Sequence, residues 1–141
     1  MITFQEKYKN NLILLKSFEF AKKVVQYTEK LEEDRKYVIA NQLLKSGTSI
    51  GANIKEAQNS ESKADFIHKM KIAAKEIEET KYWLLLCERA KSYPFNEDLK
   101  EQLIEYTEEV IEDLHFYVRD SERMKKFPHL LKVWLFPDNL D

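Results

Sequence analysis

Residues 62–87 read SKADFIHKMKIAAKEIEETKYWLLLC, and this stretch decides the fold. Ser62 and Asp65 have the spacing of a capping box, which predicts a helix start. Apolar and small residues then recur at spacings of four and three, the pattern of one buried helix face in a bundle. This face consists of Phe66, Met70, Ala73, Ile77, Thr80, Leu84 and Cys87. We therefore expect a helix over about 63–92.

Three other stretches have the same periodicity and predict helices over about 12–31, 36–59 and 97–127. In the first of them the expected buried face consists of Leu14, Phe18, Ala21, Val25 and Thr28. Asn96 is placed to cap the last of them. Connections of three to five residues make neighbouring helices antiparallel. The sequence thus predicts an all-α protein, a single up-down-up-down four-helix bundle over 1–141.

Both glycines of the chain, Gly47 and Gly51, lie inside the second predicted helix. Each glycine costs a helix interior about 1 kcal/mol relative to alanine. The apolar period nevertheless continues in phase through Ile50 and Ile54, so we expect an unbroken helix. Its small side chains then permit another helix to approach closely. The spacing of a phosphate-binding loop is missing.

Composition excludes several classes of protein. The chain has 141 residues with only two Gly and three Pro, too few for the turns of an all-β fold. Cys87 is the only cysteine, which excludes an internal disulfide and a cysteine-based zinc cluster and fits a reducing cytoplasm. We see neither a signal peptide nor a membrane span. The formal net charge of −2 is not typical of a strong nucleic-acid binder.

Several carboxylates and histidines are candidate ligands for a dinuclear metal site of the kind found in ferritin-like bundles. Glu112 and His115 share one predicted helix, and Asp65 and His68 share another; Glu19 and Glu56 complete the candidate set. In an antiparallel pair the two histidines are about 7 Å apart along the axis. We therefore expect no metal, no cofactor and no catalytic site.

The second predicted helix also carries a polar stripe beside its apolar one. Its members are Gln42, Ser46, Ser49, Asn53 and Glu56. Such a stripe faces solvent or lines an oligomer interface, where an Asn fixes register through hydrogen bonds. The pattern alone leaves both interpretations open.

Charge is unevenly distributed along the chain. Basic residues gather in the first third, with aromatic residues between them that could stack on bases. This nucleic-acid candidate comprises Lys16, Lys22, Lys23, Lys30, Arg35, Lys36 and Lys45. The last predicted helix has an acidic outer face, either solvated or a docking face for a basic partner. An apolar tail over 129–137 packs within its own bundle or on a neighbouring subunit.

A family resemblance rests on the second and third predicted helices. Residues 42–56 follow the pattern QLxxSxxSIxxNIxE, and Ser62, Asp65 and Phe66 come after it, then Ile72-Ala73 and Glu79. The chain resembles the bacterial four-helix bundle proteins encoded in intervening sequences of large-subunit ribosomal RNA genes, which are sometimes labelled ribosomal-protein-like. The likeness extends over roughly 17–124 and is strongest over 49–66.

The resemblance implies an antiparallel four-helix protomer without catalytic activity. Related members, among them the accessory protein of diversity-generating retroelements, look like ring-shaped homopentamers. We therefore predict a non-enzymatic, cytoplasmic homo-oligomer, with a pentamer favoured, that serves as a scaffold or adaptor. The polar stripe is then assigned to the oligomer interface. The alternative function is RNA or DNA binding through the basic surface of the first two predicted helices.

Overall fold

The computed structural model describes residues 1–94 and 97–124, and all regular secondary structure in this part is helical. The helices are α1 (Phe4–Lys7), α2 (Leu12–Glu33), α3 (Tyr37–Ala57), α4 (Lys63–Arg89) and α5 (Glu97–Met124). None of the described helices is long and apolar enough to cross a bilayer.

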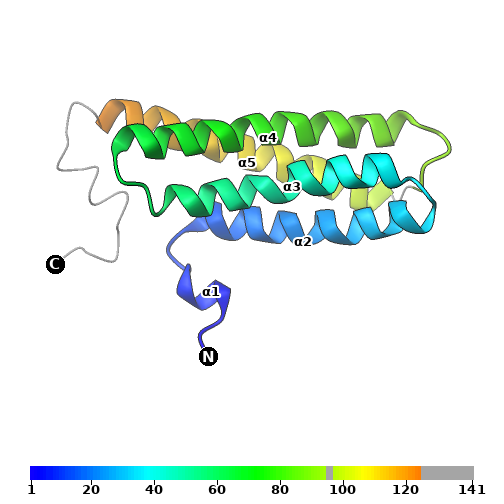
Figure 1. The fold of residues 1–141 in the computed structure, drawn as a ribbon, viewed down its shortest axis with the longest axis horizontal. Helices are drawn as coiled ribbons and strands as arrows, with labels where there is room; N and C mark the ends of the chain where they lie inside the picture. The colour runs from blue at the N-terminus through cyan, green and yellow to red at the C-terminus, as the bar shows by residue number, and fades with distance from the viewer. Residues whose placement is uncertain (95–96, 125–141) are drawn as a thin grey trace.

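The four long helices run side by side, each antiparallel to the next along the chain (Figure 1). Helix α3 packs on α2 and α4, and α5 closes the arrangement by packing on α4 and α2. The predicted all-α antiparallel four-helix bundle is therefore confirmed. The short helix α1 lies outside the bundle, beside α2.

The helix ends differ from the predicted ranges by a few residues. Helix α2 runs two residues past the expected end at 31, and Arg35 then takes a left-handed φ of 63° that turns the chain. Helix α4 ends at Arg89 rather than 92, because Ala90 is already extended. The predicted cap Asn96, the end of the last helix at 127 and the tail over 129–137 lie outside the described residues.

The buried stripe of α4 has the predicted members. All seven side chains of the stripe from Phe66 to Cys87 are at most 2% exposed. For α2 the predicted face was right only in part: Leu14 and Thr28 are buried, but Val25 is 39% exposed and Phe18 only half-buried. The buried face of α2 is formed by Ile13, Leu14, Ser17, Phe20, Val24, Tyr27, Thr28 and Leu31.

Helix α3 continues without a break through both glycines, as predicted. A Cβ atom at Gly47 would lie 2.8 Å from Val24 Cγ1, and one at Gly51 would lie 3.3 Å from Ser17 Oγ. These distances are shorter than ordinary van der Waals contacts. The glycines therefore permit α2 and α3 to approach closely in the middle of the bundle.

Side-chain caps fix three helix starts, and at α2 the Asn11 side chain accepts from the backbone N–H of Leu14. Ser62 Oγ accepts a hydrogen bond from the backbone N–H of Asp65 at the start of α4, as predicted. Thr3 and Glu6 form a reciprocal capping box at α1 that the sequence reasoning did not use. Phe4 of α1 stacks on Phe18 of α2 with ring centroids 4.2 Å apart. This aromatic contact holds α1 against the outside of the bundle.

Candidate functional site

The polar stripe of α3 faces α4 within the same protomer. Ser46 is 1% exposed, and its Oγ accepts a 2.9 Å hydrogen bond from the Thr80 hydroxyl of α4. The assignment of Ser46 to an oligomer interface was therefore wrong. Ser46 also belongs to the buried apolar stripe of α3, and a small hydroxyl suits that position because a buried partner satisfies it.

The other members of the stripe lie further out. The Ser49 hydroxyl donates to the Lys45 carbonyl over 2.8 Å, and the Asn53 amide donates to the Ser49 carbonyl over 2.8 Å. Glu56 is exposed and forms a 3.0 Å ion pair with Lys69 of α4. Gln42 is half-buried. For Gln42, Ser49, Asn53 and Glu56 the interface role stays a prediction.

Two members of the predicted basic surface are directed at α5. Lys16 Nζ lies 2.8 Å from Glu109 Oε1 and 2.9 Å from Asp113 Oδ2. Both carboxylates raise the pKa of Lys16 above its ordinary value. Lys23 Nζ donates to Gln102 over 3.0 Å and lies 5.5 Å from the ring centre of Tyr106. These two lysines join α2 to α5.

The remaining basic residues make local contacts or are exposed, and their role in nucleic-acid binding stays a prediction. Lys22 pairs with Glu19 on its own helix, and Lys36 Nζ lies 5.1 Å from the Tyr93 ring centre. The side chains of Lys30, Arg35 and Lys45 are exposed. Positive charge on α2 and α3 is thus divided between contacts inside the bundle and scattered exposed positions.

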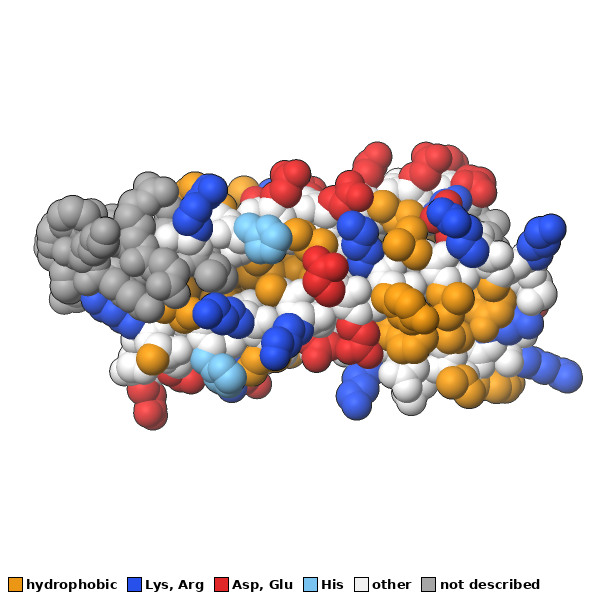
Figure 2. All heavy atoms as spheres, turned by 90° about the horizontal axis from the view of Figure 1, so that it is seen from above, with side chains coloured by type: hydrophobic (Ala, Val, Ile, Leu, Met, Phe, Trp, Pro, Cys, Tyr) orange, Lys and Arg blue, Asp and Glu red, His pale blue; other side chains and the backbone are white. Residues whose placement is uncertain are grey.

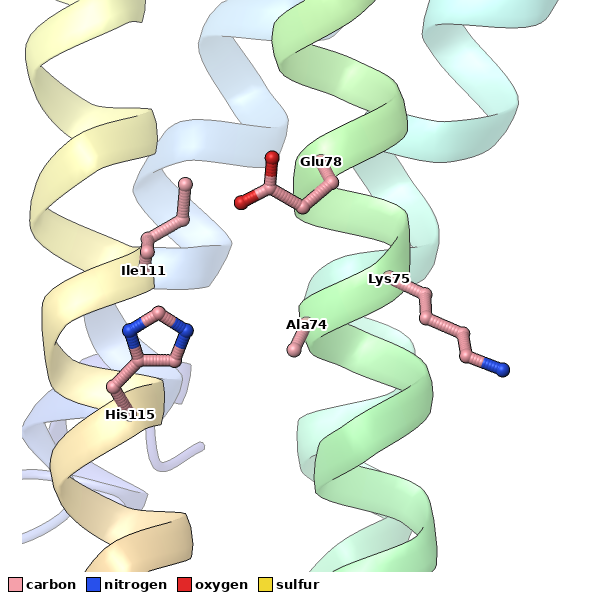
Figure 3. Close-up of a pocket in the computed structure, with 5 residues that line it drawn as sticks. All are labelled: Ala74, Lys75, Glu78, Ile111 and His115. Atoms are coloured by element: carbon pink, nitrogen blue, oxygen red, sulfur yellow. The ribbon is translucent and has the colours of Figure 1, made fainter.

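The histidines do not gather metal ligands. His68 and His115 are exposed, and the described residues contain no group of three or more His, Cys, Asp or Glu placed to hold a metal ion. His115 lines a small pocket of about 180 Å³ between α4 and α5 together with Glu78 and Ile111. Figure 3 shows the imidazole and the carboxylate on opposite helices at the mouth of this gap. One imidazole and one carboxylate fall short of the three protein ligands of a catalytic zinc site.

Cys87 is buried beside Tyr27. Burial raises the pKa of the thiol above its ordinary value, and contact with the Tyr27 hydroxyl offsets only part of this effect. Because the thiolate is the reactive form, the thiol is protected in the folded chain.

An apolar patch covers the C-terminal half of α4. We define the apolar patch as the residues Tyr82, Leu85 and Leu86, which are 60%, 37% and 40% exposed. The Trp83 ring lies edge-on to that of Tyr82, at 5.1 Å between centroids. Val38, 76% exposed, lies at the facing end of α3. Figure 2 shows hydrophobic side chains gathered over this part of the molecule.

The sequence reasoning missed this patch, although a signal was present. Residues 82–87 are six consecutive hydrophobic residues, and only Leu84 and Cys87 belong to the predicted stripe. A helix of 3.6 residues per turn cannot bury six successive side chains on one face. The other four must therefore point partly or wholly away from the core.

A comparison with protein-family models matches residues 9–115 to the 23S rRNA-intervening sequence protein model. The match extends over most of the four-helix bundle. The chain belongs to this family. The resemblance read from the pattern of residues 42–66 is thereby confirmed. Helix α1 and the residues after 115 lie outside the matched range.

One similar solved structure is described as a protein with unknown function from the S23 ribosomal protein family of Bacteroides thetaiotaomicron VPI-5482. It is 39% identical to this chain, with a TM-score of 0.71. The alignment covers 75% of this chain and 97% of that one. No curated protein matches the chain.

Proposed function

We propose that this protein is a non-enzymatic homo-oligomeric scaffold or adaptor, whose subunits associate through exposed side chains of α3 and α4. The single observation that carries the proposal is the apolar patch of Tyr82, Leu85 and Leu86. Contiguous exposed apolar surface on a water-soluble bundle marks an interaction site. The chemistry at this surface supports binding, since no candidate nucleophile or metal ligand lies in the patch.

The surroundings of the patch are those of an association surface. Aromatic residues are enriched in protein interfaces, charged residues are depleted from the interface core, and the rim is polar. Tyr82 and Trp83 provide the aromatic centre, and the ion pair of Glu88 with Lys100 lies at one end. Val38 is a further exposed apolar residue, at the end of α3 that faces this part of α4. Burial of such side chains provides the free energy of association.

The size of the assembly is a part of the proposal that rests on the family resemblance. A ring of five copies is the favoured form, and a cytoplasmic location fits the single cysteine. The solved relative carries no assigned function that would name a partner. The proposal therefore concerns how the subunits assemble, and it names no macromolecule that the assembly binds.

Subunit number in solution tests this proposal. We expect native mass spectrometry and light scattering to give a homo-oligomer for the natural chain. Leu86→Asp should dissociate it, because a carboxylate in an apolar interface loses its hydration without gaining a partner. Val25→Asp on α2 is the matched control, since Val25 is 39% exposed and Leu86 40%. A monomeric natural chain at micromolar concentration overturns the proposal.

Asn53 offers a separate test of the polar stripe. If Asn53 contributes to the interface, Asn53→Leu should change the subunit number or its concentration dependence. An unchanged assembly of unchanged stability removes Asn53 from the interface and leaves the apolar patch as the contact. The same spectra, recorded on protein from its own host, report any bound RNA or DNA, which would instead favour the basic residues of α2.

A further inference from the structure

The side of α5 next to the apolar patch is acidic. Lys100 of α5 pairs with Glu88 of α4, and Ile111 lines a pocket with Ala74, so these pairs fix the register of the two helices. In this register Glu101 and Glu105 lie level with Leu85 and Tyr82. Glu108 follows on the same edge of α5, since it lies three residues before Ile111. We define the acidic edge as Glu101, Glu105 and Glu108.

The acidic edge differs from the opposite side of α5 in how its charge is balanced. Towards α2, Lys16 pairs with two carboxylates of α5. The three glutamates of the acidic edge are exposed and form no ion pair within residues 1–94 and 97–124. Like charges at spacings of three and four repel one another in a helix. Figure 2 shows acidic side chains along one edge of the molecule, with Lys and Arg side chains between this edge and the hydrophobic patch.

An apolar patch near three glutamates that are unpaired within the described residues suits an occupant that is apolar and basic. Residues 125–136 of this chain read KKFPHLLKVWLF, with three lysines, no acidic residue and seven large apolar side chains. This segment lies beyond residue 115, where the match to the family model ends. Its chemistry is complementary to both parts of the surface.

The distance along the bundle decides which copy is bound. The register of α4 and α5 places Met124 level with the start of α4 near Lys63. Tyr82 is then about 28 Å further along the bundle at 1.5 Å per residue. Leu130, six residues after Met124, reaches at most about 21 Å even when the chain is fully extended. The first half of the segment therefore cannot cover the patch of its own copy, and only residues from about 133 onward are far enough along the chain to reach it. Binding of the whole segment, with the lysines at 125 and 126, requires a second copy.

We propose that residues 125–136 of one copy bind the apolar patch and the acidic edge of a second copy. The apolar side chains of the segment cover Tyr82, Leu85 and Leu86, and its lysines face Glu101, Glu105 and Glu108. The inference rests on the proposed homo-oligomer and names the segment that joins its subunits. It also gives the acidic face of α5 a basic partner, which the sequence left open.

Charge reversal with rescue tests the pairing on the full-length chain. We expect Lys125→Glu/Lys126→Glu/Lys132→Glu to raise the dissociation midpoint of the assembly about tenfold or more. Glu101→Lys/Glu105→Lys/Glu108→Lys should do the same, and the six substitutions together should restore association. Glu29→Lys/Glu32→Lys/Glu33→Lys, at exposed positions of α2, controls for net charge. Reversals that act additively, without rescue, overturn the proposal.

Cross-linking tests whether the contact joins two copies. One chain carries Leu85→Cys, and a second chain of different isotopic mass carries Leu131→Cys. After the two are mixed and exchanged, a short bismaleimide should join one chain of each mass. Val25→Cys in place of Leu85→Cys should give no such product, and Cys87 is buried and protected. The proposal is overturned if no cross-link forms. It is also overturned if a chain that carries both Leu85→Cys and Leu131→Cys forms cross-links only within itself.

The homo-oligomer and the segment bound between its subunits can be tested separately. If Leu86→Asp dissociates the assembly but the lysine reversals and the cross-linking have no effect, the scaffold proposal stands and the bound segment is wrong. If the natural chain is a monomer at micromolar concentration, both are wrong. Dissociation by Leu86→Asp together with charge rescue and a cross-link between copies supports both.

Discussion

The hydroxyl of Thr80 on α4 donates a hydrogen bond of 2.9 Å to Ser46 Oγ on α3, and both residues are at most 1% exposed. This pair lies in the centre of the contact between α3 and α4. Two small polar side chains from different helices thus satisfy each other inside an otherwise apolar core. The hydrogen bond also fixes the level at which the two antiparallel helices meet.

A double-mutant cycle on this pair should give a measurable coupling. Ser46→Ala and Thr80→Val should each lower the free energy of unfolding by about 1 kcal/mol. The double variant should cost about as much as one single variant, since the same bond is lost once. Urea unfolding followed by circular dichroism measures all four proteins. Strictly additive costs would mean that the hydrogen bond contributes nothing to stability.

The two glycines of α3 should respond differently to alanine. Gly47→Ala places a Cβ 2.8 Å from Val24 Cγ1, and the overpacking should cost about 1–3 kcal/mol despite the better helix propensity of alanine. Gly51→Ala meets Ser17 Oγ at 3.3 Å, a contact that a small shift relieves. We expect Gly51→Ala to cost clearly less or to stabilise. Equal denaturation midpoints for the two variants would contradict the close approach of α2 and α3 at Gly47.

The buried stripe of α4 was predictable because polar residues occupy most other positions of that helix and Ser62 marks its start. Part of the stripe of α2 was assigned one residue out of phase. Val24 and Val25 are equally apolar, so the periodicity of α2 does not say which of them is buried. The choice depends on Gly47, which leaves room for Val24 on the facing helix. Which valine is buried therefore depends on the packing of α2 against α3 and cannot be predicted from the sequence of α2 alone.

The candidate site was predictable only in part for a related reason. A hydroxyl such as Ser46 looks the same in a sequence whether it faces a second subunit or a buried threonine. The stripe of α3 was interpreted as facing solvent or a second subunit, whereas its member Ser46 contacts α4 of the same protomer. The apolar patch, in contrast, could have been found from the six hydrophobic residues at 82–87, because a single helix face cannot bury them all.

Stability should fall as the pH rises above about 8.5, where the thiol of an unfolded chain ionises. Burial raises the pKa of Cys87, so the folded state keeps a proton that the unfolded state loses, and the free energy of unfolding decreases with pH. Burial also raises the pKa of Tyr27, which adds to the decrease above about pH 10. Urea unfolding between pH 7 and 10 measures the slope.

Replacing the thiol isolates its share of this pH dependence. Cys87→Ala should be less stable at pH 7, because a buried group is lost, but its stability should fall less steeply between pH 8.5 and 9.5. The native thiol should also react with a thiol reagent only after denaturant is added. Rapid labelling of the folded chain would contradict the burial of Cys87.

Lys16 should contribute more to stability than a typical surface lysine, because it joins α2 to two carboxylates of α5. Its side chain is only 21% exposed, whereas that of Lys22 is 49% exposed and pairs with Glu19 on its own helix. Lys16→Met should therefore cost about 1 kcal/mol, and Lys22→Met about 0.3 kcal/mol or less. Methionine keeps the apolar stem and the helix propensity, so the difference reports the charge. In 1 M NaCl the Debye length falls to about 3 Å, and the cost of Lys16→Met should shrink accordingly. Equal effects of the two substitutions at low salt would mean that the bridge from α2 to α5 does not stabilise the bundle.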